Sequence, residues 1–426
     1  MKIKSVKFKL CFLMVFLLGI FSALGLNLVG NAFLFNDESI ETSSSKLISI
    51  LVQNEKGEYE TYDSNSFPSE GYSFNSQLSY CVNESELSFD SSSSLVTVKA
   101  KGSDNCFAYF SLGESCESGD CLYGAILLNE KDGFETISDA TSYIENKTTP
   151  NFNNVATTDE GLFAVADDNG TSYYYRGAVN DNWVEFAGMY WRIVRVAGDG
   201  TVKLIYAGKT IGATEDNTQI STSAFNSSYD SYEYTGYVYA EDELHGTTTD
   251  SLIKTNLDSW YKDNLSSYSS HIADTNFCVD RTGYVDAENS TVLNTQDFTG
   301  EEDYISYGSR YRLYSNNTPE LKCTNQSDLV SSKVGLISLD EAALAGAVWN
   351  TTNTDYYLHS GSWYWTLSPY NFSSENAFVG VINASGYLDQ NDVSLTTGGV
   401  RAVISLKSNT PISGEGTVDN PYKVLS

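Results

Sequence analysis

Three short apolar runs near the C-terminus constrain the fold more than any other part of the sequence. They cover residues 363–369, 377–382 and 399–407, and Gly, Asn, Asp and Ser are frequent between them. Apolar runs of this length between turn-forming residues are typical of core β-strands. We therefore predict a small sheet whose polar connections are exposed, where binding residues are commonly found.

The charge of the chain limits its partners. Its 426 residues include 55 Asp and Glu against 25 Lys and Arg, a formal net charge of −30. Nucleic acid and anionic lipid surfaces would be repelled by this field, so we predict no nucleic-acid partner. Hydrophobic residues make up 41% of the chain, which indicates globular structure with room for two or three domains.

The N-terminus indicates export. Four lysines precede an apolar run at residues 10–29, and small residues follow it. This order is typical of a signal peptide, although a run of about 20 apolar residues also suffices to span a bilayer. We expect residues 1–32 to be a signal peptide or an N-terminal membrane anchor, with a linker over 33–46. Membrane contact is expected only through 10–29, and the protein is expected outside the cell, secreted or anchored to the outer face of the cytoplasmic membrane.

Six cysteines follow Cys11, and an even number in an exported chain predicts three disulfides. The spacing 116–121 could also suit a metal, but no second Cys or His pair stands at matching spacing, which disfavours zinc. Proximity in the sequence favours the pairs Cys81–Cys106, Cys116–Cys121 and Cys278–Cys323.

Residues 47–112 alternate between apolar runs and turn signals. This rhythm predicts a small antiparallel, sandwich-like β-domain, which a disulfide would stabilise because so small a core is marginal by itself. We expect this domain to act as a spacer. Residues 113–160 are expected to form a connector, and 161–426 a larger mixed α+β domain.

Two runs in the larger domain, 190–196 and 202–206, flank a Gly-Asp-Gly turn and predict a β-hairpin. Arg192 and Arg195 differ in strand parity, so we predict that they point to opposite faces and that one of them pairs with a buried carboxylate.

Two helices are predicted in the same domain. Apolar residues recur at helical spacing over 251–267, which indicates one buried stripe. Residues 340–345 predict a short helix with Ser338 or Asp340 as its N-cap.

Several motifs occur in a fixed order along residues 160–426. They are Tyr-Arg-Gly-Ala-Val, Trp-Arg-Ile-Val-Arg-Val, Phe-Cys-x-Asp-Arg, Thr-Pro-x-Leu-Lys-Cys, Gly-Leu-Ile-Ser-Leu-Asp-Glu-Ala, Tyr-Trp-Thr-Leu-Ser-Pro and Gly-Val-Arg. In this combination the chain resembles a family of uncharacterised exported surface proteins of Gram-positive gut bacteria and their wall-less relatives (Bacillota and Mycoplasmatota types). Their C-terminal domain ends in a Trp-Trp-Leu-Arg-Ser-Pro … Gly-Val-Arg-Pro pattern and resembles the C-type lectin and formylglycine-generating-enzyme fold. The resemblance implies a C-type-lectin-like α+β domain and no particular activity.

The chain departs from that pattern at two places. Thr366 and Leu367 stand where the family has Leu-Arg, and Ala402 stands where it has Pro. The first departure removes the arginine of any inherited anion site. We predict that Arg401 is a structural residue that closes the last strand against a carboxylate.

Residues for catalysis are not grouped in the sequence. No cysteine follows Cys323, although formylglycine-generating enzymes use a C-terminal cysteine pair, and His245, His271 and His359 are scattered. We therefore predict no enzymatic activity. An extracellular glycan hydrolase that uses an acid pair such as Asp389 and Asp392 is an alternative.

Binding is the favoured function. In lectin-like folds the loops around the last strands contact the ligand, whereas Trp363 and Trp365 are expected in the core. We predict a cell-surface adhesin or ligand-recognition module for a protein or glycan, with a structural surface-layer or appendage subunit as another alternative. We predict no cofactor; Ca²⁺ would suit the oxygens of 389–392, but the Glu-Pro-Asn and Gln-Pro-Asp signatures are absent. The predicted ligand-binding residues are Tyr370, Asn371, Phe372, Asn376, Tyr387, Asp389, Gln390, Asn391 and Asp392.

Overall fold

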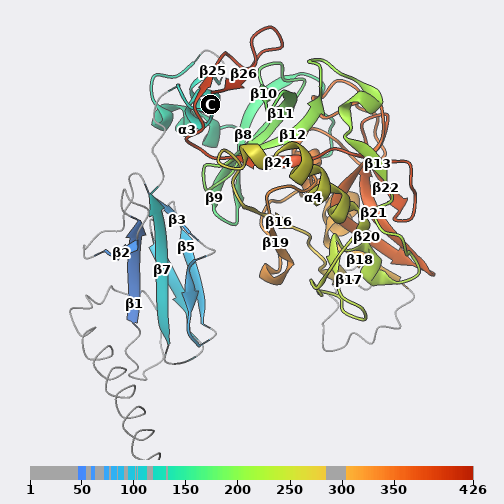
Figure 1. The fold of residues 1–426 in the computed structure, drawn as a ribbon, viewed down its shortest axis with the longest axis horizontal. Helices are drawn as coiled ribbons and strands as arrows, with labels where there is room; N and C mark the ends of the chain where they lie inside the picture. Colours follow the sequence, from blue (N-terminus) through green and yellow to red (C-terminus); the bar gives the residue numbers. More distant parts are fainter. Residues whose placement is uncertain are drawn as a thin grey trace, which may run out of the picture. The chain divides into compact units, whose positions relative to one another are not determined.

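The chain divides into two compact units, Met1–Leu112 and Gly113–Ser426, which are described separately (Figure 1). The computed structural model describes residues 47–53, 59–62, 72–75, 78–83, 85–90, 95–100, 102, 104–112, 119–130, 133–284 and 304–425. Within these ranges the structure is mostly β-sheet with a few helices, which confirms the predicted α+β class. The predicted signal or anchor segment and the linker lie outside them.

The smaller unit consists of a five-stranded sheet and a separate hairpin, β5–β6. In the sheet the order is β2-β1-β7-β3, and β4 also pairs with β7. Its strands are β1 (Leu47–Gln53), β2 (Tyr59–Thr61), β3 (Tyr72–Phe74), β4 (Tyr80–Cys81), β5 (Glu86–Asp90), β6 (Leu95–Lys99) and β7 (Asn105–Leu112).

The two longest strands of this sheet run parallel. β1 pairs with β7 from Leu47 opposite Asn105 to Val52 opposite Phe110, so the prediction of a purely antiparallel domain was wrong. Alternate residues of β1, among them Ile48 and Ile50, pack with Phe110 on one apolar face. The hairpin covers the same core with side chains such as Val96.

A disulfide joins neighbouring strands of the smaller unit. Cys81 of β4 and Cys106 of β7 are register partners, with their Cα atoms 4.0 Å apart, and their sulfur atoms are bonded. The predicted Cys81–Cys106 pair is therefore present. Cys116 lies outside the described residues, so the predicted Cys116–Cys121 pair stays a prediction.

The larger unit contains two large sheets, which separate into two groups of strands in Figure 1. The first has the order β24-β12-β11-β10-β26-β25, with β9 paired to β11 and to β8. Its strands are β8 (Asp159–Asp167), β9 (Gly170–Gly177), β10 (Trp183–Phe186), β11 (Met189–Val196), β12 (Val202–Gly208), β24 (Val403–Leu406), β25 (Ile412–Ser413) and β26 (Tyr422–Val424).

The second sheet has the order β13-β23-β20-β18-β17, and β21 links β20 to β22. Its strands are β13 (Ser221–Ser223), β17 (Gly283–Tyr284), β18 (Tyr304–Tyr307), β20 (Tyr364–Ser373), β21 (Asn376–Ile382), β22 (Leu388–Asp392) and β23 (Gly398–Val400). Two small pairs complete the unit: β14 (Val238–Tyr239) with β15 (Thr249–Asp250), and β16 (Thr275–Cys278) with β19 (Leu329–Ser332).

Three local predictions for this unit agree with the structure. The hairpin is β11–β12, and the longer predicted helix is α4, which begins after its N-cap Ser251. The shorter helix, α6, has Ser338 as its N-cap, in a capping box with Glu341. The helices are α2 (Leu122–Leu128), α3 (Ile137–Glu145), α4 (Leu252–Asn264), α5 (Gly308–Arg310) and α6 (Leu339–Ala345), and a π-helical segment, η4 (Tyr311–Asn316), follows α5.

One hydrophobic cluster spans both large sheets. Trp191 of β11 and Trp365 of β20 are fully buried in it, whereas Trp363 is partly buried at its margin. Apolar residues of α2 and α3, among them Ile126 and Ile144, belong to the same cluster. The segment that we expected to be a connector therefore supplies two helices to the core of the larger unit.

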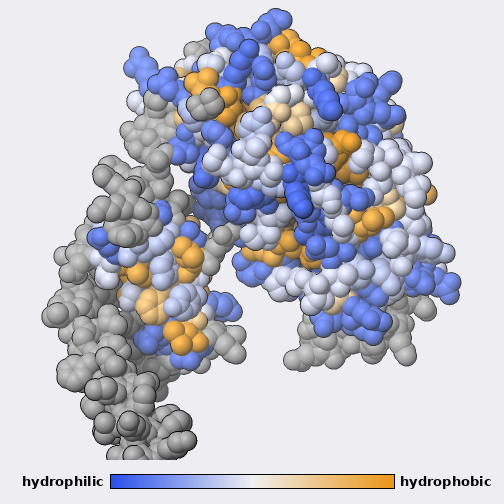
Figure 2. Space-filling view, in the orientation of Figure 1, coloured by the Kyte–Doolittle hydropathy of each residue, from blue (hydrophilic) through white to orange (hydrophobic). Residues whose placement is uncertain are grey.

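The described part of the face drawn in Figure 2 is predominantly polar. In the face drawn in Figure 2, hydrophobic residues form small, separate groups within hydrophilic surroundings, as is usual for exposed apolar side chains. Among the described helices, none is long and apolar enough to cross a membrane.

Candidate functional site

The predicted ligand-binding residues lie on adjacent strands rather than in loops. Tyr370, Asn371 and Phe372 belong to β20, and Asn376 begins β21. Residues 389–392 belong to β22, and Tyr387 immediately precedes this strand. The three β20 residues are buried, with only 2 to 7% of their surface exposed, so their predicted exposure was wrong. The other predicted residues are all partly buried.

Tyr370 is buried because an aromatic group from other segments covers it. Its ring stacks on that of Trp349, with centroids 4.7 Å apart, and Tyr314 of η4 meets Trp349 edge-on at 5.7 Å. Tyr314 is 48% exposed, so the group reaches the surface. Ring pairs in these geometries are stabilised by more than the burial of their apolar surface. Sequence analysis missed Trp349 and Tyr314, because nothing local links either residue to Tyr370.

Arg310 lies among the same rings. Its guanidinium carbon is 5.3 to 5.6 Å from the ring centroids of Tyr304, Tyr314 and Tyr370. These distances are typical of cation–π contacts. Burial raises the pKa of Tyr370, and the positive charge of Arg310 opposes that rise. We call Tyr304, Arg310, Tyr314, Trp349 and Tyr370 the aromatic platform.

The charge of Arg310 is not balanced by a neighbouring acid. No carboxylate oxygen of the described residues lies within 4.0 Å of its guanidinium, and its Nε is buried without a hydrogen-bond partner. Arg312, two residues further on, instead pairs with Asp280, Asp340 and Glu320. In a chain with a net charge of −30, an arginine without an acid partner in the described structure is a candidate for binding an acidic group.

Two buried polar atoms on β20 and β22, the strands that carry most of the predicted ligand-binding residues, also lack partners. The side-chain oxygens of Asn371 on β20 and Gln390 on β22 are buried without a hydrogen bond. Buried polar atoms are normally paired, so such exceptions commonly mark a place for water or a ligand.

Asp389 and Asp392 do not form an acid pair. They are three residues apart on β22, so their side chains point to opposite faces of the sheet. Asp389 accepts hydrogen bonds from Asn383 Nδ2 and the Gln390 amide, and Asp392 accepts from the amide and hydroxyl of Ser394. This geometry does not support the acid-pair hydrolase hypothesis, and it gives Ca²⁺ no converging carboxylates at these two positions.

One group of potential metal ligands occurs among the described residues. It consists of Cys81, Asp104 and Cys106, and its two sulfur atoms are joined in the disulfide. A disulfide sulfur is not a thiolate, and the thiolate is the form that binds metals. The group is therefore not a metal site.

His245 has a partner that the sequence did not indicate. Its Nδ1 lies 2.8 Å from Oδ1 of Asp328, 83 residues away, and Asp328 is fully buried. The second carboxylate oxygen of Asp328 accepts the Arg281 amide at 2.8 Å. Both oxygens are thus occupied, and the carboxylate ties the His245 segment to the residues that precede β19.

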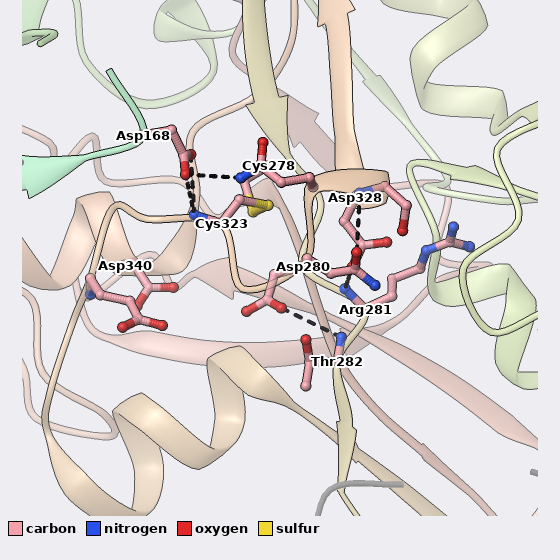
Figure 3. Close-up of a disulfide and its surroundings, with 12 residues drawn as sticks. Asp168, Cys278, Asp280, Arg281, Thr282, Cys323, Asp328 and Asp340 are labelled. Atoms are coloured by element: carbon pink, nitrogen blue, oxygen red, sulfur yellow. Dashed lines mark hydrogen bonds between the residues drawn. A yellow bond between two sulfur atoms is a disulfide. The ribbon is translucent and has the colours of Figure 1, made fainter. Parts of the chain in front are cut away.

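The second disulfide lies close to this carboxylate (Figure 3). Cys278 ends β16 and is bonded to Cys323, as predicted. The Cys323 amide donates to both carboxylate oxygens of Asp168 at 3.1 Å. The disulfide therefore holds the segment around residue 323 against β16. The hydrogen bonds to Asp168 hold the same segment against the turn between β8 and β9.

A bulge in β11 changes the directions of two arginines. The register between β11 and β12 shifts between Ile193 and Arg195, so Arg192 lies opposite Ile205 and Arg195 lies opposite Lys203. Cross-strand partners share a face, and Ile205 and Lys203 are two residues apart. Arg192 and Arg195 therefore point to the same face, and the prediction of opposite faces was wrong.

Arg195 is the arginine that pairs with buried carboxylates. Its Nε lies 2.9 Å from Glu341 Oε1, its Nη1 lies 2.9 Å from Asp167 Oδ2, and Lys203 Nζ lies 2.6 Å from the same oxygen of Glu341. Burial by itself would raise the pKa of Glu341, but Lys203 and Arg195 outweigh it and hold this pKa at about 2. Glu341 thus connects α6 to the first sheet.

In comparisons with protein-family models, curated proteins and solved structures, no match to this chain was found.

Proposed function

We propose that this chain is an exported binding protein whose aromatic platform contacts a glycan that carries an acidic group. The observation that carries the proposal is Arg310, which lies among three tyrosine rings beside the exposed Tyr314 and has no carboxylate partner in the described structure. The C-type-lectin-like arrangement of the larger unit belongs to the same proposal.

The chemistry of the platform suits a sugar. The rings of Trp349 and Tyr314 offer faces or edges for the C–H groups of a pyranose. A guanidinium can bind a carboxylate through two parallel hydrogen bonds. An acidic sugar would supply the charge that Arg310 lacks.

Export is supported by the disulfides. Two cysteine pairs are bonded in the described chain, and disulfides persist in oxidising compartments. This is compatible with an extracellular location, which remains part of the proposal together with the signal or anchor function of residues 1–32.

The first test is a glycan and host-protein array probed with the protein lacking residues 1–32, with calcium and with chelator. We expect saturable binding to glycans that carry carboxylates, and weaker binding to their neutral counterparts. Calcium dependence would support an ion at the site. Self-association with a blank array would favour the structural-subunit alternative, and turnover of a glycan with a bell-shaped pH profile would favour a hydrolase.

Two substitutions test the platform directly. Arg310→Gln and Tyr314→Ala are each expected to weaken binding to an acidic glycan by about tenfold, the size of one charge-assisted or aromatic contact. The affinities can be measured by titration calorimetry. Tyr268→Ala is the matched control, because Tyr268 is also a well-exposed tyrosine, at 40%, but lies outside the platform. Unchanged binding in both platform variants would refute the proposed surface.

A further inference from the structure

A second group of cationic and aromatic residues lies inside the larger unit and shares no member with the platform. It consists of Arg192 of β11, Arg401 between β23 and β24, and the three tyrosines Tyr356, Tyr357 and Tyr364, all of them buried. We call these five residues the arginine–tyrosine cluster.

The guanidinium of Arg192 is held by neutral groups. Its Nε donates to Asn182 Oδ1 at 2.5 Å and its Nη2 donates to the Val179 carbonyl at 2.7 Å. Its carbon lies 4.3 Å from the ring centroid of Trp183 and 5.4 Å from that of Tyr357. Throughout the described ranges, no carboxylate comes within ion-pair distance of this side chain.

Arg401 is held in the same way. Its Nε donates to the Tyr206 carbonyl at 3.1 Å, its Nη1 donates to the Leu358 carbonyl at 3.0 Å, and its carbon lies 4.7 Å from the Tyr364 ring centroid. No acid of the described chain pairs with it, so the predicted carboxylate partner was wrong. Two buried positive charges therefore occur in one cluster, and within the described chain neither of them makes an ion pair.

Two hydroxyl groups of the cluster also lack partners. Tyr364 Oη donates to the Leu358 carbonyl at 2.8 Å, but Tyr356 Oη and Tyr357 Oη are buried without any hydrogen bond. A buried hydroxyl without a partner destabilises the folded state. Hydroxyl donors and guanidinium groups are both satisfied by an anion.

The charge imbalance is unfavourable as it stands. Burial lowers the pKa of Arg192 to about 9, and the charge of Arg401 acts in the same direction. A buried ion normally requires a partner of opposite charge. Arg195 and Lys203, on the same face of the first sheet, have such a partner in Glu341. No carboxylate of the described chain makes an ion pair with the arginine–tyrosine cluster, and the charge of Asp181 acts on Arg192 only from a greater distance.

We propose that the arginine–tyrosine cluster binds a small inorganic anion of the halide type, for which chloride is the natural probe. The anion accepts hydrogen bonds from the hydroxyls of Tyr356 and Tyr357 and neutralises the two guanidinium groups. A small ion is proposed because all five residues of the cluster are buried. Access is from the Arg192 side, where Arg192 and Tyr357 are 8% and 7% exposed, against 2% for Arg401.

Such an ion would connect three distant parts of the chain. Arg192 belongs to the first sheet, the tyrosines to residues 356–364, and Arg401 to the junction between the two sheets. The stability of the larger unit would then depend on the halide concentration outside the cell, separately from general ionic strength.

The test is thermal unfolding of the purified full chain in sodium chloride, bromide or gluconate at equal ionic strength. We expect the unfolding temperature to rise by roughly 3 to 5 °C in a hundredfold excess of halide over its dissociation constant, and to stay unchanged in gluconate. In bromide-soaked crystals, an anomalous peak is expected between Arg192 and Arg401. Equal unfolding temperatures in all three salts, or no peak in the cluster, would overturn the proposal.

Conservative variants make the test specific. Tyr356→Phe and Tyr357→Phe keep the rings and should fold, and together they should reduce the halide-dependent rise at least severalfold. In gluconate both should be as stable as the parent or slightly more stable, because each removes an unpaired hydroxyl. Tyr237→Phe is the matched control, since the hydroxyl of Tyr237 is also buried without a partner but lies outside the cluster. A full halide response in the double variant would refute the assignment of these hydroxyls.

Discussion

Replacing Glu341 with alanine is expected to destabilise the larger unit by about 3–5 kcal/mol, because it leaves Arg195 and Lys203 buried without their shared counter-charge. The side chain is 3% exposed, so water cannot compensate for the loss. Urea or guanidinium unfolding, followed by tryptophan fluorescence, measures the change. Trp191 and Trp365 are both buried in the affected core and should report it.

Glu341 also takes part in the capping box of α6, so the two roles must be separated. Ser338→Ala removes the hydroxyl that accepts the Glu341 amide at 3.0 Å, and it should cost only about 1 kcal/mol. If Glu341→Ala cost no more than Ser338→Ala, the capping role alone would explain its effect and the buried ion network would be unimportant.

The same carboxylate predicts a pH dependence. The pKa of Glu341 is held at about 2 in the folded state against 4.5 for the free group, so its contribution to stability is complete above pH 4.5 and is lost as the pH falls towards 2. Its size is roughly 3 kcal/mol. Unfolding free energies measured between pH 6 and pH 2 should show this loss, and the Glu341→Gln variant should show a correspondingly smaller one.

The second large effect is expected from the Cys278–Cys323 disulfide. The double variant Cys278→Ser/Cys323→Ser should lower the unfolding free energy of the larger unit by about 4 kcal/mol, because the bridge closes a loop with a sequence separation of 45 residues and restricts the unfolded chain. Each single variant should be at least as damaging, since it leaves a free thiol. Calorimetry of the purified protein gives the measurement.

The other disulfide provides a matched control. Cys81→Ser/Cys106→Ser removes a bridge with a sequence separation of 25 residues from the smaller unit. By the same relation it should cost about 3.5 kcal/mol, and it should shift the transition of that unit only. If both double variants shifted the same transition equally, the two units would not unfold independently.

Features that depend on neighbouring residues could be predicted from the sequence. The apolar spacing of α4 and the Gly-Asp-Gly turn between β11 and β12 each determine a local structure. The bonded pairs Cys81–Cys106 and Cys278–Cys323 could be proposed because each cysteine has a close candidate partner in the sequence. Local preferences of this kind are kept in the folded protein because the tertiary contacts favour the same structures.

Features that depend on distant residues could not be predicted. A single extra residue at the β11 bulge reverses the parity of Arg195 relative to Arg192, and no local composition marks it. Tyr370 is buried by Trp349, and the parallel pairing of β1 with β7 joins strands from opposite ends of the smaller unit. For the candidate site, the sequence indicated β20–β22. It did not indicate the aromatic residues that cover this surface or the arginine that gives it a positive charge.

The parallel pairing of β1 with β7 determines how the smaller unit would respond to mechanical tension. Because both strands run in one direction, β1 begins beside Asn105 and β7 ends at Leu112, at the far end of the same pair. For a protein anchored at its N-terminus and bound through its C-terminal unit, a pull would act along the strands. The hydrogen bonds between β1 and β7 would then resist it together instead of opening one after another. Resistance of this kind is governed by the rate of forced unfolding rather than by equilibrium stability.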